Sequence, residues 1–149
     1  MKQLLIKKIK NKLKYFYYEK FIKNIIFFKQ PFIGSFNREK CSNLDELISI
    51  HFGNYTSLDH PCKETLSKAL RELKGKKATI IETGSSAWGS NSSMLFDLYV
   101  YNFGGNFESV DIRIQPSIKL VKQCSKFSRF WCDDSIHWLT NLKNISKNK

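Results

Sequence analysis

The chain has 149 residues, of which 42% are hydrophobic, and a formal net charge of +12 at pH 7. This length is enough for one ordinary hydrophobic core, and no run of about 18 apolar residues predicts a membrane-spanning helix. The charge is uneven: residues 1–30 carry nine Lys against Glu19, a balance of +8, whereas residues 31–78 and 79–149 each carry eight basic and six acidic residues, a balance of +2 each. The positive charge therefore belongs to a terminal segment and not to a basic domain.

The types of charged and sulfur-containing residue argue against several classes of function. Lysine outnumbers arginine by 21 to 4, whereas bidentate recognition of phosphates and bases favours arginine, so a nucleic-acid partner is not expected. No signal peptide is predicted, because Lys7 and Lys8 interrupt the first apolar run. We expect reduced thiols in a cytoplasmic protein. No metal or redox site is predicted, because four cysteines show neither CxxC spacing nor a paired histidine: Cys41, Cys62, Cys124 and Cys132.

Residues 1–30 have the pattern of a basic amphipathic helix. Apolar residues recur at helical spacing with lysines between them: Leu5, Ile9, Leu13, Phe16, Ile22, Ile25 and Ile26. Such a helix can lie on an anionic membrane surface, which would place the protein at the inner face of the membrane, with the lysine stems around a buried apolar face. It can equally pack its apolar face on the domain and leave the lysines in solvent. The sequence leaves both interpretations open.

Residues 31–77 are predicted to form a helical extension before the main domain. Ser42 is expected to cap a short helix, in a variant of the capping box, and Gly53 is expected to end it. A second helix is predicted over residues 64–74, with Gly75 at the position after the helix that favours glycine.

Residues 78–149 alternate between strand and helix patterns. Apolar runs at 78–81, 107–112 and 128–132 are separated by helical segments near 91–102 and 116–124, and a last helix starts at 135. A strand–helix–strand–helix–strand order within about 55 residues is typical of a parallel sheet with right-handed crossovers. We therefore predict an α/β domain at 78–149, preceded by N-terminal helices.

A glycine and serine loop follows the first strand of this domain. The sequence there reads Glu82-Thr83-Gly84-Ser85-Ser86, so a glycine falls where the strand turns into a helix. Without a Cβ the backbone can pass close to a ligand, and the next helix offers unpaired N–H groups. A phosphate-binding P-loop is rejected, because Gly89 is followed by Ser90 and not by lysine.

Acidic residues end the second and third strands. Asp111 ends the second strand, and a carboxylate at that position can accept hydrogen bonds from both hydroxyls of a ribose. Asp133, Asp134 and Ser135 end the third, where an aspartate can accept from the exocyclic amine of an adenine. Either Asp133 or Asp134 is a candidate for that contact, and the pair Asp134-Ser135 fits it better.

Taken in order over about residues 78–140, these motifs resemble the first, second and third motifs of class I S-adenosylmethionine-dependent methyltransferases, which have a Rossmann-like fold. The resemblance implies that S-adenosylmethionine is the cofactor. The glycine loop would wrap its amino-acid part, the second-strand acid would bind ribose, and the third motif would frame adenine. The residues implied are Glu82, Gly84, Ser85, Ser86, Asp111, Asp134 and Ser135.

This sequence departs from the family pattern at two places. The family's commonest loop is Gly-x-Gly-x-Gly, whereas here Gly84 and Gly89 are separated by four residues that include Trp88. The family also continues with further strands, of which the fourth usually carries catalytic or substrate residues, so we expect a truncated chain that does not methylate by itself. Neither catalytic residues nor a methyl acceptor are predicted. Without a fourth strand, the first strand becomes a sheet edge that invites self-association.

Two other functions compete with the methyltransferase interpretation. A nicotinamide dinucleotide-binding module shares the glycine turn and the acidic residue on the second strand, but the motif Gly-x-Gly-x-x-Gly is absent. A noncatalytic peripheral protein would bind its partner through residues 1–30 and retain the Rossmann-like half as a relic.

Overall fold

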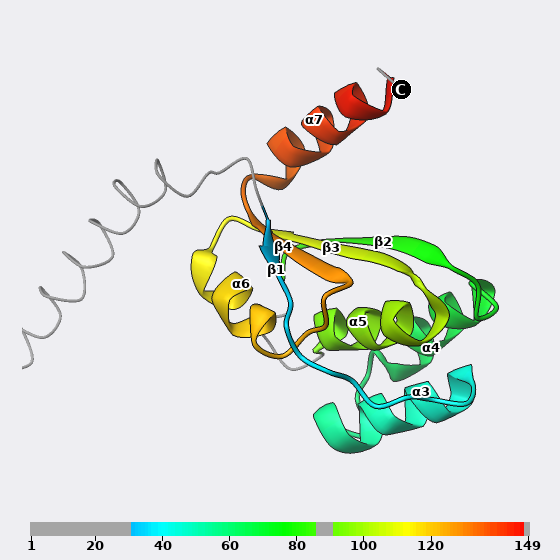
Figure 1. The fold of residues 1–149 in the computed structure, drawn as a ribbon. Helices are drawn as coiled ribbons and strands as arrows, with labels where there is room; N and C mark the ends of the chain where they lie inside the picture. Colours follow the sequence, from blue (N-terminus) through cyan, green and yellow to red (C-terminus); the bar gives the residue numbers. More distant parts are fainter. Residues whose placement is uncertain (1–30, 86–90, 148–149) are drawn as a thin grey trace, which may run out of the picture.

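The computed structural model describes residues 31–85 and 91–147, which form an α/β fold around a four-stranded, mostly parallel sheet (Figure 1). The strands lie in the order β1 (Phe32–Ile33), β4 (Ser128–Cys132), β3 (Gly105–Asp111) and β2 (Ala78–Thr83). Strands β2, β3 and β4 run parallel, and β1 pairs antiparallel with β4. The predicted alternation of strands and helices after residue 78 is confirmed. The helix predicted for residues 1–30 lies outside the described residues.

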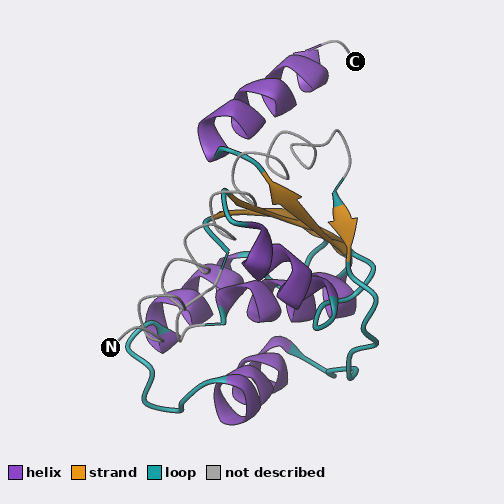
Figure 2. Ribbon diagram, turned by 90° about the vertical axis from the view of Figure 1, so that its left-hand side faces the viewer, coloured by secondary structure: helices purple, strands orange, loops and turns teal. Residues whose placement is uncertain are grey.

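The helices lie on both sides of this sheet. The elements are α3 (Leu44–Ile50), the π-helical turn η2 (His51–Tyr55), α4 (Lys63–Glu72), α5 (Ser92–Phe103), α6 (Ile114–Val121) and α7 (Ser135–Lys147). Figures 1 and 2 show α3 to α6 on one side of the sheet, whereas α7 projects from its other side. Within the described ranges, no helix combines the length and apolar character needed to cross a membrane.

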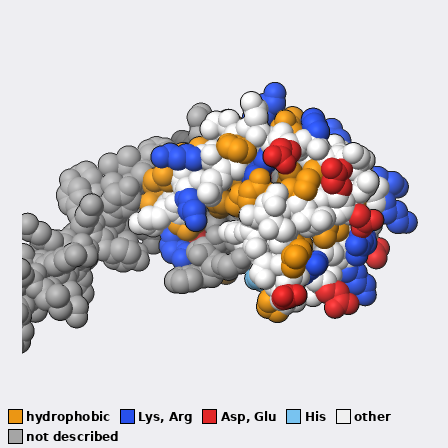
Figure 3. All heavy atoms as spheres, turned by 90° about the horizontal axis from the view of Figure 1, so that it is seen from below, with side chains coloured by type: hydrophobic (Ala, Val, Ile, Leu, Met, Phe, Trp, Pro, Cys, Tyr) orange, Lys and Arg blue, Asp and Glu red, His pale blue; other side chains and the backbone are white. Residues whose placement is uncertain are grey.

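The hydrophobic core extends from the sheet through α5 and α6, which contact the strands, to helices α3 and α4, which lie farther from the sheet (Figure 1). Side chains alternate along β2, so Ala78, Ile80 and Glu82 are partly buried while the intervening residues are exposed. Fully buried residues from the strands and from these helices meet in this core: Leu47, Phe52, Leu70, Leu95, Leu98, Tyr99, Phe107 and Phe130. Seen from below, basic side chains lie beside acidic ones on the described surface (Figure 3).

Helix α3 differs from the prediction at both of its ends. Its cap is Asn43 and not Ser42: the Asn43 Oδ1 accepts from the Glu46 N–H at 2.9 Å, while the Glu46 carboxylate accepts from the Ser42 N–H at 2.6 Å. Gly53 does not end the helix, because the chain continues through the π-helical turn. Phe52 is completely buried there, and its packing outweighs the low helix propensity of glycine.

The prediction that residues 31–77 form a helical extension is wrong for residues 31–43, which contain a strand and no helix. The two-residue strand β1 extends the sheet beyond β4, and the Gly34 N–H donates to the Ser128 carbonyl at 3.0 Å. A Cβ on Gly34 would lie 2.2 Å from the Ser125 carbonyl oxygen, so only glycine allows this close approach. Residues 31–43 therefore belong to the same packed unit as the sheet.

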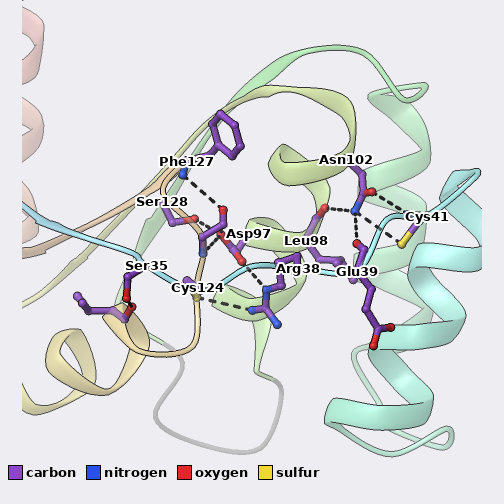
Figure 4. Close-up of polar contacts among 12 residues, drawn as sticks. Ser35, Arg38, Glu39, Cys41, Asp97, Leu98, Asn102, Cys124, Phe127 and Ser128 are labelled. Carbon is purple, nitrogen blue, oxygen red and sulfur yellow. Dashed lines mark hydrogen bonds and ion pairs between the residues drawn. The ribbon is translucent and has the colours of Figure 1, made fainter.

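A buried ion pair fastens this segment to the core (Figure 4). The Arg38 Nε lies 2.6 Å from the Asp97 Oδ2, and the two side chains are 2% and 0% exposed. The Asp97 Oδ1 also accepts from the N–H of Ser125 at 2.8 Å and from the hydroxyls of Ser125 and Ser128 at 2.6 and 2.5 Å. One carboxylate on α5 thus joins the segment before α3 to the turn that enters β4.

Candidate functional site

The carboxyl ends of β2, β3 and β4 border a hollow of about 330 Å³. Parallel strands end at the same edge of a sheet, so residues that follow different strands meet there. The polar and glycine residues that line the hollow are Gly84, Asp111, Arg113, Asp133, Asp134 and Ser135. Four of the residues predicted from the sequence, Gly84, Asp111, Asp134 and Ser135, are therefore brought together. Ser86 lies outside the described residues.

Gly84 marks the point where the chain leaves β2. Its φ of +82° lies in a region that other residues rarely adopt, and its N–H donates to the Val110 carbonyl at 2.8 Å. A Cβ built on Gly84 would meet no atom of the described residues within 4 Å. The backbone conformation therefore favours glycine here, and no described residue fills the space beside it.

The carboxylate of Asp111 is buried and heavily hydrogen-bonded. Its Oδ1 accepts from the Arg113 N–H at 2.7 Å and from the Arg113 Nε at 3.0 Å. Its Oδ2 accepts from the Arg113 Nη2 at 2.8 Å and from the Ser85 N–H at 2.9 Å. Asp111 thus joins Ser85, which follows β2, to Arg113, which follows β3, at the hollow.

These contacts change the pKa of Asp111. Burial by itself raises the pKa of this carboxyl, but the hydrogen bonds and charge of Arg113 and the Ser85 N–H outweigh it, so the pKa lies below its usual value. Because the folded state holds the charged form, the resulting stability is present above the unfolded-state pKa of about 3.9 and is lost as the pH falls through the folded pKa.

Asp111→Asn should therefore remove part of the acid sensitivity of the fold. We expect the free energy of unfolding of the wild type to fall more steeply than that of the variant between about pH 4 and the onset of acid unfolding. Urea titrations of both proteins over this range measure the difference. Parallel pH profiles would contradict the assignment, because an asparagine cannot titrate.

Arg113 is a site residue that the sequence analysis missed. It follows Asp111 by two residues, and its side chain is 43% exposed. Its guanidinium donates two hydrogen bonds to the Asp111 carboxylate. The only signal in the sequence is an arginine two positions after an acidic strand end. This spacing predicts a contact only when the turn after β3 is known to direct the Arg113 side chain toward the Asp111 carboxylate.

Glu82 accepts hydrogen bonds from three serine hydroxyls, two at the start of α5 and one on β3. Its Oε1 accepts from the Ser92 hydroxyl at 2.6 Å, and its Oε2 accepts from the hydroxyls of Ser93 and Ser109 at 2.5 and 2.8 Å. The Ser109 hydroxyl also lies 3.1 Å from that of Ser85. A carboxylate beside the first turn of a helix is favoured by the helix dipole. Glu82 and Ser85 therefore belong to a serine-rich network that joins the end of β2 to β3 and to α5, and neither residue lines the hollow.

The residues after β4 begin helix α7. The Asp134 Oδ1 accepts from the N–H groups of Ile136 and His137 at 2.9 and 3.1 Å, which is the geometry of a helix cap. The Asp133 Oδ2 lies 3.0 Å from the His137 Nδ1. Ser135 is half-buried at the hollow. Both aspartates thus line the hollow, and Asp134 also caps helix α7.

Comparisons with protein-family models, with curated proteins and with solved structures found no match for this chain. In the described part of the chain, no group of three or more His, Cys, Asp or Glu residues has an arrangement that could hold a metal ion. The hollow itself combines carboxylates, a guanidinium, a serine and an open glycine turn. The carboxylates and the serine can accept hydrogen bonds from hydroxyl and amine groups of a polar ligand, and the guanidinium can donate them.

Proposed function

We propose that this hollow binds S-adenosylmethionine and that the chain is the cofactor-binding portion of a class I methyltransferase with a Rossmann-like fold. One observation carries the proposal: Gly84, Asp111 and the pair Asp134-Ser135, which the resemblance assigns to three parts of one cofactor, line a single hollow. The parallel strands also adjoin in chain order, β2 next to β3 and β3 next to β4, which agrees with a Rossmann-like half.

The contacts of Asp111 indicate which hydrogen bonds a ribose would replace on binding. Both carboxylate oxygens already accept hydrogen bonds, so the ribose hydroxyls must replace the side-chain donors of Arg113. The backbone donors from Ser85 and Arg113 would keep the carboxylate oriented during this exchange. The guanidinium is partly exposed, so it can recover hydrogen bonds from water.

The bound cofactor would supply an activated methyl group, and the protein's part in such a transfer is mainly to position donor and acceptor. The described residues fit the donor side of that task. Glu82 joins the end of β2 to the first turn of α5 through Ser92 and Ser93, and the residues after β4 place polar groups at the hollow.

Isothermal titration calorimetry with S-adenosylhomocysteine and with NAD tests the proposal. We expect S-adenosylhomocysteine to bind more tightly than NAD. Asp111→Asn should weaken binding of S-adenosylhomocysteine by about tenfold or more, because hydrogen bonds to a charged group contribute roughly 1.5–3 kcal/mol. Arg113→Ala should bind at least as tightly as the wild type, because the guanidinium competes for the same oxygens.

Asp45→Asn is the matched control, since Asp45 lies in an exposed ion pair with Arg71 away from the hollow. Circular dichroism spectra of all variants confirm that each is folded. Tighter binding of NAD would favour a dinucleotide-binding module instead. If neither nucleotide binds, the noncatalytic interpretation is favoured, and equal affinities of Asp111→Asn and wild type would contradict the role of the carboxylate.

A further inference from the structure

Strand β2 lies at one edge of the sheet, and no described strand pairs with its outer side. The N–H groups of Ala78 and Gly84 donate to the Gly104 and Val110 carbonyls at 3.2 and 2.8 Å, so these two residues direct their backbone groups inward. Backbone groups alternate in direction along a strand. The backbone N–H and C=O groups at positions 79, 81 and 83 therefore point outward from the sheet.

The same three residues also have exposed side chains. Thr79, Ile81 and Thr83 lie on the exposed face of β2, where the Ile81 side chain is 40% exposed. Natural edge strands are often protected by charged side chains, by proline or by a bulge. The only charged residue of β2, Glu82, lies on its partly buried face and accepts hydrogen bonds from serine hydroxyls, and the strand has no proline or lysine and is rich in residues that favour strands. The edge thus offers both hydrogen-bonding groups and apolar surface to another strand.

We infer that β2 pairs antiparallel with β2 of a second copy of this chain, about a two-fold axis that passes through Ile81. In this register Ile81 lies opposite its own counterpart, and Thr79 lies opposite Thr83. Isoleucine and threonine pairs are favourable across antiparallel strands. Glu82 lies opposite Ile80, so no like charges face each other within the strand.

A second copy fits this edge better than an unrelated strand for a symmetry reason. The strand is self-complementary in the register centred on Ile81, and an isologous contact satisfies the open edges of both chains at once. Sliding one strand by a single residue would place inward-facing backbone groups against outward-facing ones. Centring on Glu82 would oppose two carboxylates, and centring on Ile80 would place Thr83 opposite residue 77, outside the strand. The pairing is independent of the hollow, because no residue of β2 lines it.

Sedimentation equilibrium over a range of protein concentrations tests the inference. The net charge of +12 opposes association, so the measurement belongs at physiological salt or above. We expect the wild type to form dimers. Ile81→Lys should weaken dimerisation by at least about tenfold, because two lysines would face each other across the axis. Ile118→Lys is the matched control, since Ile118 on α6 is also 40% exposed. A monomeric wild type, or equal weakening by both variants, would overturn the proposal.

A crosslinking variant locates the contact directly and does not depend on a destabilising charge. Directly paired residues in antiparallel strands have Cα atoms about 4.5–5.5 Å apart, which is within the range that a disulfide bridges. Ile81→Cys in a Cys62→Ser background, which removes an exposed native thiol, should therefore form an intermolecular disulfide on mild oxidation. Ile118→Cys in the same background should not. A dimer without this crosslink would show that residues 1–30 or another surface mediates association.

Discussion

Asp97→Ala is expected to destabilise the fold by about 3–5 kcal/mol, the usual cost of removing one partner of a buried ion pair. The charge of Arg38 would remain inside the protein with its side chain 2% exposed. The Ser125 and Ser128 donors that share the carboxylate would also lose their acceptor. Because native domains are stabilised by only about 5–15 kcal/mol, this loss threatens folding itself. Equilibrium urea denaturation followed by circular dichroism measures it.

The matched control is Asp45→Ala. Asp45 pairs with Arg71 at 2.8 Å, close to the 2.6 Å of the buried pair, but the two side chains are 78% and 57% exposed. Exposed ion pairs contribute about 0–1 kcal/mol, since water and salt screen them. The comparison therefore separates burial from charge pairing. Similar losses for both variants would show that Asp97 does not fasten the segment before α3.

Gly105→Ala should be the most damaging of the glycine substitutions in the sheet, with a cost of about 3 kcal/mol or more. A Cβ at this position would lie 1.8 Å from the carbonyl oxygen of Ala78, and the φ of +113° is one that other residues rarely adopt. Ala78 and Gly105 are the first pair in the register of β2 and β3. A shift of either backbone would disturb the two strands whose ends border the hollow. Thermal unfolding or loss of soluble expression reports the effect.

Gly53→Ala provides the opposite expectation for the same chemical change. Gly53 lies in the π-helical turn, where a Cβ would meet nothing within 4 Å. Alanine has a higher helix propensity than glycine, so this variant should gain about 0.5–1 kcal/mol. A loss of stability at position 53, or no loss at position 105, would contradict the backbone geometry described above.

The sequence was most informative about the elements after residue 78. The apolar runs and the helical spacing between them are local patterns, and each matches a strand or helix close to its predicted position. The meeting of Gly84, Asp111 and Asp134 at one edge was predictable for a related reason. Once the strands are parallel, their carboxyl ends share an edge whatever the detailed packing.

The sequence was less informative before residue 78. Strand β1 has only two residues, too few to show any periodicity, and it forms because the open side of β4 accepts it. Helical turns continue past Gly53 because Phe52 is completely buried, a packing effect that propensity does not contain. The partner of Asp97 is Arg38, 59 residues away, and nothing local pairs them.

At the candidate site, the sequence by itself determined which residue types lie at the strand ends, because the alternation of strand and helix patterns can be recognised in short segments of the chain. Only the tertiary structure decided their partners. It pairs Asp111 with Arg113 and ties Glu82 to the serines of α5. Hydrogen bonds act over about 3 Å. Their formation therefore depends on how the loops and helix ends are packed. The periodicity of apolar residues in the sequence does not contain this information.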